Sequence, residues 1–241
     1  MHVWIGTSGF QYPEWKGSFY PEKISTRLML PYYAERFVST ESNYSFRSIP
    51  SRKTIEAWAA ATPTHFRFSF KAPQKITHFA KLRGCAETLS FFHEAISPLS
   101  EKLGVVLFQL PPTFRKDAPL LETFVKELPT GMRAAFEFRH ESWFDDEVFG
   151  CLRDHQVALC IAESETLVTP SVVTADFGYL RLRREDYTPA QIRHWADWIG
   201  EQGSGWSDAF IYFKHEEQAV GPKFAQQMQA ALAKLDRSSK K

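Results

Sequence analysis

Short apolar segments alternate with longer helix-like segments from one end of this chain to the other. Eight segments have the length and content of buried strands: residues 3–7, 40–44, 66–71, 104–110, 133–139, 157–162, 178–183 and 209–214. Helical patterns occupy residues 28–37, 52–61, 87–102, 118–128, 145–155 and 189–201, and a last helix is expected at about 222–235. This alternation is typical of a parallel sheet whose strands are connected by covering helices.

The number of strands selects among the α/β folds. Eight strands in 241 residues fit a (β/α)8 TIM barrel, whose usual length is about 250 residues. A doubly wound open sheet is the main alternative, but the sequence has neither a GxGxxG turn after a strand nor a P-loop. No linker or repeat divides the chain. We therefore predict one TIM-barrel-like domain over residues 1–236, followed by a frayed basic tail over 237–241.

Composition excludes several classes of protein. The formal net charge of +1 gives no whole-chain argument for binding nucleic acid or a membrane. Three cysteines without a CxxC pair predict neither a disulfide framework nor a structural zinc site. The chain has no signal-peptide pattern and no apolar run near the ~20 residues of a membrane span. We expect a cytoplasmic protein with no membrane partner.

The fifth expected strand points to a functional site. Strand alternation places Phe136 and Phe138 on one face and Glu137 and Arg139 on the other. Charged side chains are rarely buried unless they are paired, so the second face is expected to look into a polar cavity.

Other strands deliver polar groups at the same end, where TIM barrels carry out their chemistry. The expected cations are Arg67, Lys71, Arg139, Arg181, Arg183 and Lys214, and the expected acids are Glu41, Glu137 and Glu163. Because cations outnumber acids, we predict a small anionic ligand, such as a phosphate ester or a carboxylate. The alternative for Arg67 and Glu137 is a buried ion pair that fills a layer of the barrel.

Three reaction schemes follow from these residues. In the first, Glu137 is the general base and Lys71 or His140 is a general acid or electrostatic stabiliser. In the second, Lys71 or Lys214 forms a Schiff base with a carbonyl compound. In the third, ranked last because no short ligand spacing supports it, a divalent metal is held by Glu41, Glu137, Glu163, His215 and Glu216.

The first scheme is the one we carry forward, with Glu137, Lys71 and His140 as catalytic residues and no metal. The expected substrate-binding residues are Glu41, Asn43, Gln109, Arg139, Trp143, Arg181 and Lys214. Hydrolase, lyase and isomerase-like chemistry are all compatible with this set, and no cofactor-binding motif is recognised.

Aromatic residues cluster in the loop after the first strand. Tyr12, Trp15 and Tyr20 can either stack on a sugar or base or anchor the loop over the barrel. We favour the structural interpretation, because aromatic residues in ordered loops commonly serve as anchors.

The order of motifs along the chain resembles a known family. The matching segments are Gly6-Thr7-Ser8-Gly9-Phe10-Gln11-Tyr12, Glu41-Ser42-Asn43-Tyr44-Ser45-Phe46, Phe68-Ser69-Phe70-Lys71-Ala72-Pro73, Phe108-Gln109-Leu110-Pro111-Pro112 and Phe136-Glu137-Phe138-Arg139-His140. They resemble the YecE-like family, a domain of unknown function found in bacteria and archaea. The resemblance implies a TIM-barrel-like fold and supplies no activity. The chain departs from the family pattern at Arg181-Leu182-Arg183-Arg184 and at Phe213-Lys214-His215-Glu216.

Two other functions remain open from the sequence. The cation-rich rim and an exposed Trp15 would suit a nucleic-acid-binding or nucleic-acid-processing protein. A non-catalytic interaction protein on a barrel scaffold is the third hypothesis, because a fold does not determine a function.

Overall fold

Eight parallel strands form the centre of this computed structural model, which describes residues 1–163, 167–202, 205–214 and 219–238. The strands are β1 (His2–Thr7), β2 (Ser39–Ser42), β3 (Arg67–Lys71), β4 (Leu103–Gln109), β5 (Ala134–Glu137), β6 (Ala158–Glu163), β7 (Phe177–Leu182) and β8 (Asp208–Phe213). They pair in the order β1-β8-β7-β6-β5-β4-β3-β2, and a parallel bridge between Ser8 and Glu41 brings β1 back to β2. The predicted (β/α)8 barrel is confirmed.

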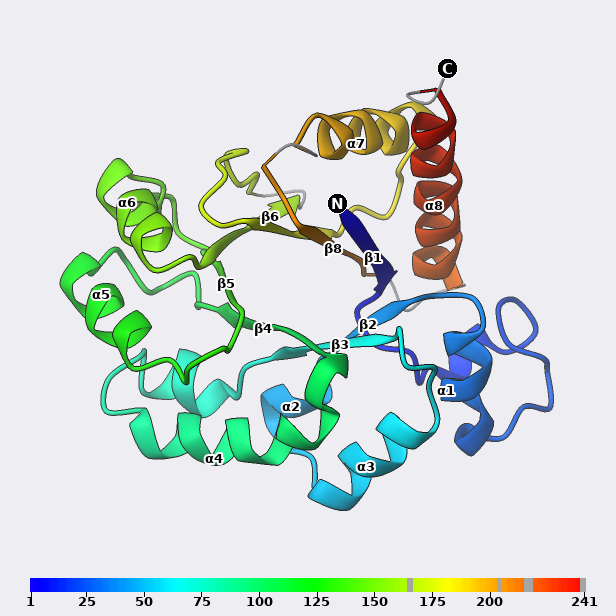
Figure 1. The fold of residues 1–241 in the computed structure, drawn as a ribbon, viewed down its shortest axis with the longest axis horizontal. Coiled ribbons are helices and arrows are strands. Elements are labelled where there is room, and N and C mark those ends of the chain that lie inside the picture. Colours follow the sequence, from blue (N-terminus) through cyan, green and yellow to red (C-terminus); the bar gives the residue numbers. More distant parts are fainter. Residues whose placement is uncertain (164–166, 203–204, 215–218, 239–241) are drawn as a thin grey trace.

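Helices surround the strands on the outside (Figure 1). The α-helices are α1 (Thr26–Ala34), α2 (Tyr44–Arg47), α3 (Arg52–Ala60), α4 (Ala86–Ile96), α5 (Ala118–Lys126), α6 (Asp146–Asp154), α7 (Pro189–Glu201) and α8 (Val220–Ser238). Four shorter helical segments are η1 (Pro13–Trp15), η2 (Lys75–Phe79, a π-helix), η3 (Ser97–Lys102) and η4 (Glu141–Trp143). Within the described residues, no helix has the length and apolarity needed to cross a membrane.

Local sequence signals explain where several helices begin. The Ser51 hydroxyl accepts a hydrogen bond from Thr54 N and caps α3. Thr188 and Gln191 form a capping box at α7, whose first residue is Pro189. On α8, Phe224 and Met228 are buried in the core, so the apolar stripe of this helix packs against the barrel.

The expected elements are all present, and the differences lie at their ends. The expected strand 40–44 stops at Ser42, because Asn43 is already helical (φ −89°, ψ −10°) and α2 begins at Tyr44. The expected helix 87–102 divides into α4, which ends at Ile96, and η3, which begins at Ser97. Within η3 the helical backbone is interrupted at Ser100, whose φ is 51°. The helix α8 continues to Ser238, so residues 237 and 238 of the expected tail are helical; residues 239–241 lie outside the described residues.

Polar side chains meet inside the barrel halfway along the strands. The Tyr212 hydroxyl donates to Ser69 Oγ at 2.8 Å and is hydrogen-bonded to Ser39 Oγ at 2.6 Å. At this level β1 and β2 approach so closely that a Cβ on Gly6 would lie 1.8 Å from Ser39 O. Only glycine therefore fits at this closing seam. The layer fills the barrel and supports the groups above it.

Arg67 lies at the N-terminal end of the barrel and not at the expected site. Its guanidinium is 4.6 Å from the ring centre of Trp4, and it donates to Thr64 O at 3.2 Å. Arg67 is the first residue of β3, whereas Glu137 is the last residue of β5. Because the strands are parallel, these two residues sit at opposite ends, and the suggested Arg67–Glu137 ion pair is wrong.

The aromatic loop after β1 is an anchor, as we favoured. Trp15 and Tyr20 are buried and pack against each other and against Phe19, which reaches Tyr33 and Phe37. The suggestion of an exposed Trp15 is wrong, since only 1% of its surface is accessible. The loop therefore gains its order from core packing.

Candidate functional site

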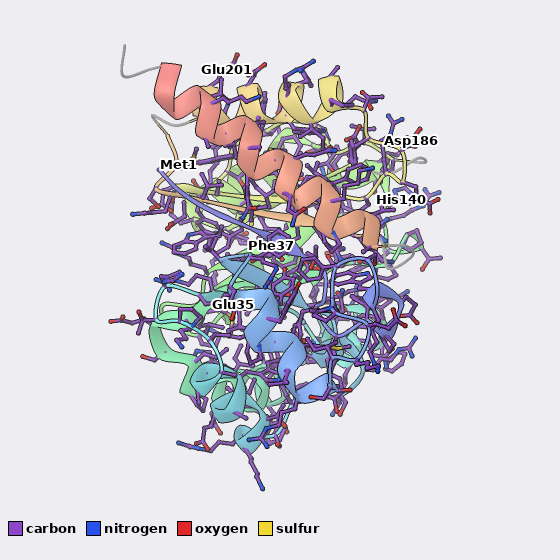
Figure 2. The ribbon with its side chains drawn as sticks, turned by 90° about the vertical axis from the view of Figure 1, so that its right-hand side faces the viewer. Met1, Glu35, Phe37, His140, Asp186 and Glu201 are labelled. Atoms are coloured by element: carbon purple, nitrogen blue, oxygen red, sulfur yellow. The ribbon has the colours of Figure 1, made fainter. Side chains whose placement is uncertain are left out.

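The C-terminal ends of the strands bring most of the predicted site residues together. Figure 2 shows His140 and Asp186, which follow β5 and β7, at one end of the molecule and Met1 at the other. In a TIM barrel this end carries the functional groups. The site described below lies inside the barrel at this end.

Arg181 is the centre of the cluster. It lies near the end of β7, and its side chain is only 3% exposed. One terminal nitrogen donates to Glu41 Oε1 at 2.9 Å, and the other donates to Glu137 Oε2 at 2.5 Å. Burial opposes the charge of Arg181, but the two carboxylates outweigh that effect and raise its pKa. Arg181 thus links β2 to β5 across the barrel interior.

Glu41 is fixed by neutral donors as well. Its carboxylate is completely buried and accepts hydrogen bonds from Ser8 Oγ at 2.7 Å and from the Tyr179 hydroxyl at 2.6 Å. Burial and the adjacent Glu41 carboxylate raise the pKa of Tyr179, which keeps this hydroxyl protonated as a donor. With Arg181 included, three side chains hold Glu41, so it is suited to orienting the site.

Glu137 is surrounded by guanidinium groups. Besides Arg181, it forms an ion pair with Arg139, and Arg183 lies 3.6 Å from Glu137 Oε1. The side chains of Arg139 and Arg183 are 20% and 19% exposed, so both reach toward solvent at the barrel mouth. Arg139 Nε is buried without a hydrogen-bond partner in the described part of the chain. A donor in that situation is suited to an incoming acceptor.

Lys71 differs from the arginines in its contacts. Its ammonium lies 3.9 Å above the ring of Phe46, and it forms no ion pair within the described residues. Burial, followed by the charge of Arg181, lowers the pKa of Lys71 to about 8. A substantial fraction of Lys71 is therefore a neutral amine near physiological pH.

We predict that acetylation of Lys71 by acetic anhydride follows a titration midpoint near pH 8. The folded protein loses this proton below the pKa of the unfolded chain, so the unfolded state binds more protons above pH 8. The free energy of unfolding of the wild type, relative to Lys71→Met, should consequently rise from about pH 8 toward pH 10.5. Mass spectrometry and urea denaturation measure the two effects. A flat difference across this range would contradict the shift.

His78, on η2, packs edge-on against the ring of Phe46. Its ring centre is 4.9 Å from that of Phe46, and its Nδ1 is 2.9 Å from Thr77 Oγ1. Burial and the nearby charge of Lys71 lower the pKa of His78. The imidazole is therefore neutral at pH 7 and can accept a proton.

The remaining predicted residues are less central. Gln109 Oε1 accepts from Arg181 at 3.3 Å, so it joins the cluster. His140 Nδ1 accepts from Ser142 N and caps η4, and among the described residues it forms no hydrogen bond or ion pair with Glu137 or Lys71. Asn43 and Lys214 directly follow β2 and β8 and are half-buried.

Trp143 is a core residue. It is fully buried, it stacks on Phe138 with ring centres 4.7 Å apart, and its indole N–H donates to Phe114 O at 2.7 Å. No part of its ring faces the barrel mouth in a way that a ligand can reach. The sequence could not separate this packing role from ligand contact, because both need an aromatic after the strand.

We predict that Trp143→Ala lowers the free energy of unfolding by about 3–5 kcal/mol, because it leaves a large cavity. Phe91→Ala is the matched control, since Phe91 is 63% exposed on α4 and should change stability little. Urea denaturation measures both variants. Equal small effects would contradict the assignment of Trp143 to the core.

The metal scheme is not supported by the described residues. Glu163 accepts hydrogen bonds from Tyr187 and Trp195, both at 2.8 Å, and faces α7 outside the barrel. His215 and Glu216 lie outside the described residues. Within the described part of the chain, no group of three or more His, Cys, Asp and Glu side chains is placed to hold a metal ion.

Four residues that contact the cluster were not among the predicted site residues: Ser8, Phe46, His78 and Tyr179. Tyr179 shares the parity of Arg181 on β7, so the strand pattern carried its signal. Ser8 follows β1 in the same way. Phe46 and His78 lie on the short helices α2 and η2, which are too short to show a helical pattern of apolar residues in the sequence.

Comparison with known proteins identifies the family. The model of the family described as "Protein of unknown function DUF72" matches residues 4–241. The chain belongs to the DUF72 family. The YecE-like resemblance is thereby confirmed, because the UPF0759 protein YecE of Escherichia coli K12 is 32% identical over 146 residues, which are 59% of this chain and 50% of that protein.

Other DUF72 relatives agree with this assignment. The UPF0759 protein YunF of Bacillus subtilis is 31% identical over 150 residues, which are 59% of this chain and 52% of that protein. The match therefore spans about half the length of these curated relatives. A crystal structure of a DUF72 protein from Thermotoga maritima superimposes with a TM-score of 0.84 at 25% identity, covering 97% of this chain and all of that one. One from Enterococcus faecalis, with a TM-score of 0.81 at 20% identity over 96% and 95% of the two chains, shares the fold.

Proposed function

We propose that this DUF72 protein is an enzyme that acts on a small anionic ligand at the C-terminal ends of the barrel strands. The observation that carries the proposal is the charge of the cluster. Four cationic side chains, Lys71, Arg139, Arg181 and Arg183, meet two carboxylates, Glu41 and Glu137. A carboxylate or phosphate would balance the excess of positive charge.

The contacts divide the cluster into roles. Glu41 and Glu137 hold Arg181 in the barrel, while Arg139 and Arg183 reach the mouth, where their exposed edges can bind an anion. The Glu137 carboxylate is engaged by Arg181 and Arg139, so these contacts hold it as a counter-charge within the cluster. Lys71, with its lowered pKa, is the better candidate for proton transfer or for nucleophilic attack.

A thermal-shift panel at constant ionic strength tests the proposal. A ligand that binds only the native state raises the melting temperature. We expect a rise with a subset of sugar phosphates, nucleotides or dicarboxylates and none with their uncharged analogues. The rise should be lost in Arg139→Gln and kept in Arg52→Gln, whose exposed side chain pairs with Glu56 on α3. Equal shifts in the two variants would contradict an anion site at Arg139.

A basic groove at the same end supports nucleic acid as a second candidate. The groove has a volume of about 630 Å³, and its lining cations Lys81, Arg83, Arg115 and Lys116 outnumber its lining acids Asp117 and Glu147. Arg83 pairs with Asp117 and Lys116 pairs with Glu147. Phe79, two residues before Lys81, is 73% exposed and offers a stacking surface. Fluorescence anisotropy with a single-stranded oligonucleotide tests this function. Binding that weakens with salt and is lost in Lys81→Glu with Arg115→Glu supports it, and no binding at low salt excludes it.

A further inference from the structure

Lys71 carries the amino group of the cluster, and its contacts indicate that it does more than neutralise a carboxylate. The two buried carboxylates are engaged by Arg181, and Glu137 also by Arg139. Lys71 forms no ion pair within the described residues, and its ammonium rests on Phe46 instead. A lysine kept only to neutralise Glu41 or Glu137 would be expected to contact one of them.

The position of Lys71 suits attack on a bound ligand. It is the last residue of β3, so its side chain projects at the barrel mouth on the same interior face as Ser69. Its main-chain oxygen accepts from Ser45 Oγ at 2.6 Å, which ties the end of β3 to α2 and fixes Phe46 beside the amine. The arginines that would bind the anionic group of a ligand lie across the same mouth.

We propose that Lys71 is a nucleophilic amine that forms an imine with a carbonyl compound carrying a carboxylate or phosphate group. This inference rests on the proposed anion site and names the substrate class for it. Arg139 and Arg183 would bind the anionic group, while Lys71 Nζ faces the carbonyl carbon. Phe46 covers the amine on one side, and burial together with the charge of Arg181 favours the neutral amine.

The chemistry balances without a cofactor. The neutral amine adds to the carbonyl carbon, and one nitrogen proton moves to the oxygen to give the carbinolamine. A further proton, taken up from solvent, lets the hydroxyl group leave as water and leaves a protonated imine that keeps the second nitrogen proton. His78 is the neighbouring group able to relay this proton, since its imidazole is neutral and lies against Phe46. The imine then withdraws electrons from the adjacent carbon, as Schiff-base enzymes require.

Reductive trapping tests the inference on the intact protein. The full chain is incubated at pH 8 with pyruvate or glyoxylate and sodium cyanoborohydride, and modified lysines are identified by peptide mass spectrometry. A lysine with a pKa near 8 has a neutral-amine fraction on the order of a hundredfold above that of an ordinary lysine at this pH. We expect Lys71 to be modified at least about tenfold faster than the exposed Lys75 on η2.

The controls separate this inference from the anion site. Lactate and glycolate have a hydroxyl group in place of the keto or aldehyde group, so they should leave no adduct but should slow the trapping of pyruvate by competition. Adducts spread over the lysines in proportion to exposure, with Lys71 no faster than Lys75, would overturn the imine. If lactate then still protects Lys71 from acetic anhydride, the anion site stands and the imine alone is wrong. If lactate neither protects Lys71 nor competes, the proposed anion site fails as well.

Discussion

Arg181→Met should destabilise the protein by about 3–5 kcal/mol, as expected when one partner of a buried ion pair is removed. The substitution keeps much of the side-chain volume but leaves the Glu41 carboxylate buried without its cation. Arg52→Met is the matched control, because its pair with Glu56 is exposed and worth about 0.5 kcal/mol or less. Urea denaturation monitored by tryptophan fluorescence measures both variants.

A second substitution shows whether the lost free energy belongs to the ion pair. Glu41→Gln in the Arg181→Met background removes the stranded charge, so the double variant should be more stable than the sum of the single effects predicts. Strict additivity, or a loss below about 1 kcal/mol for Arg181→Met, would contradict the role of Arg181 as the centre of the cluster.

Glu137→Gln should lower the free energy of unfolding by about 2 kcal/mol, because three guanidinium groups lose the carboxylate that they face. The amide keeps one acceptor oxygen, so the fold should remain. The variant leaves an additional unbalanced positive charge at the mouth, and added sulfate should raise its melting temperature more than that of the wild type. Thermal denaturation with a sulfate titration measures the effect.

The comparison variant for this prediction is Glu141→Gln, whose side chain is exposed on η4. It should leave both the melting temperature and the sulfate response unchanged. A Glu137→Gln protein with wild-type stability and wild-type sulfate response would contradict the role of Glu137 as the counter-charge of the guanidinium groups.

The barrel could be predicted because its signals are local and repeated. Each strand carries its own apolar pattern, and caps such as Ser51 and Thr188 mark helix starts within a few residues. Strand parity also predicted that Glu41, Glu137 and Arg181 share the interior. The sequence could not predict that Arg181 pairs with both carboxylates, because this pairing depends on how far apart β2, β5 and β7 lie around the barrel.

The errors have a common physical origin. Arg67 and Lys71 lie on the same face of β3 but at its opposite ends. A side chain reaches the C-terminal mouth of the barrel only if its residue lies near the C-terminal end of the strand. Glu163 is one residue past the interior position Ala162, so a shift of one residue places it outside against α7. Register and strand ends, rather than residue type, therefore decide which charges belong to the site.

Differential acetylation of lysines with and without the anionic compound that raises the melting temperature most is the decisive measurement. A bound anion beside Lys71 favours its charged form and shields it, so both effects slow its reaction with acetic anhydride. We predict protection concentrated at Lys71, with little change at the exposed Lys75. A compound that stabilises the protein while Lys71 reacts at an unchanged rate would show that the ligand binds elsewhere and would contradict the proposed site.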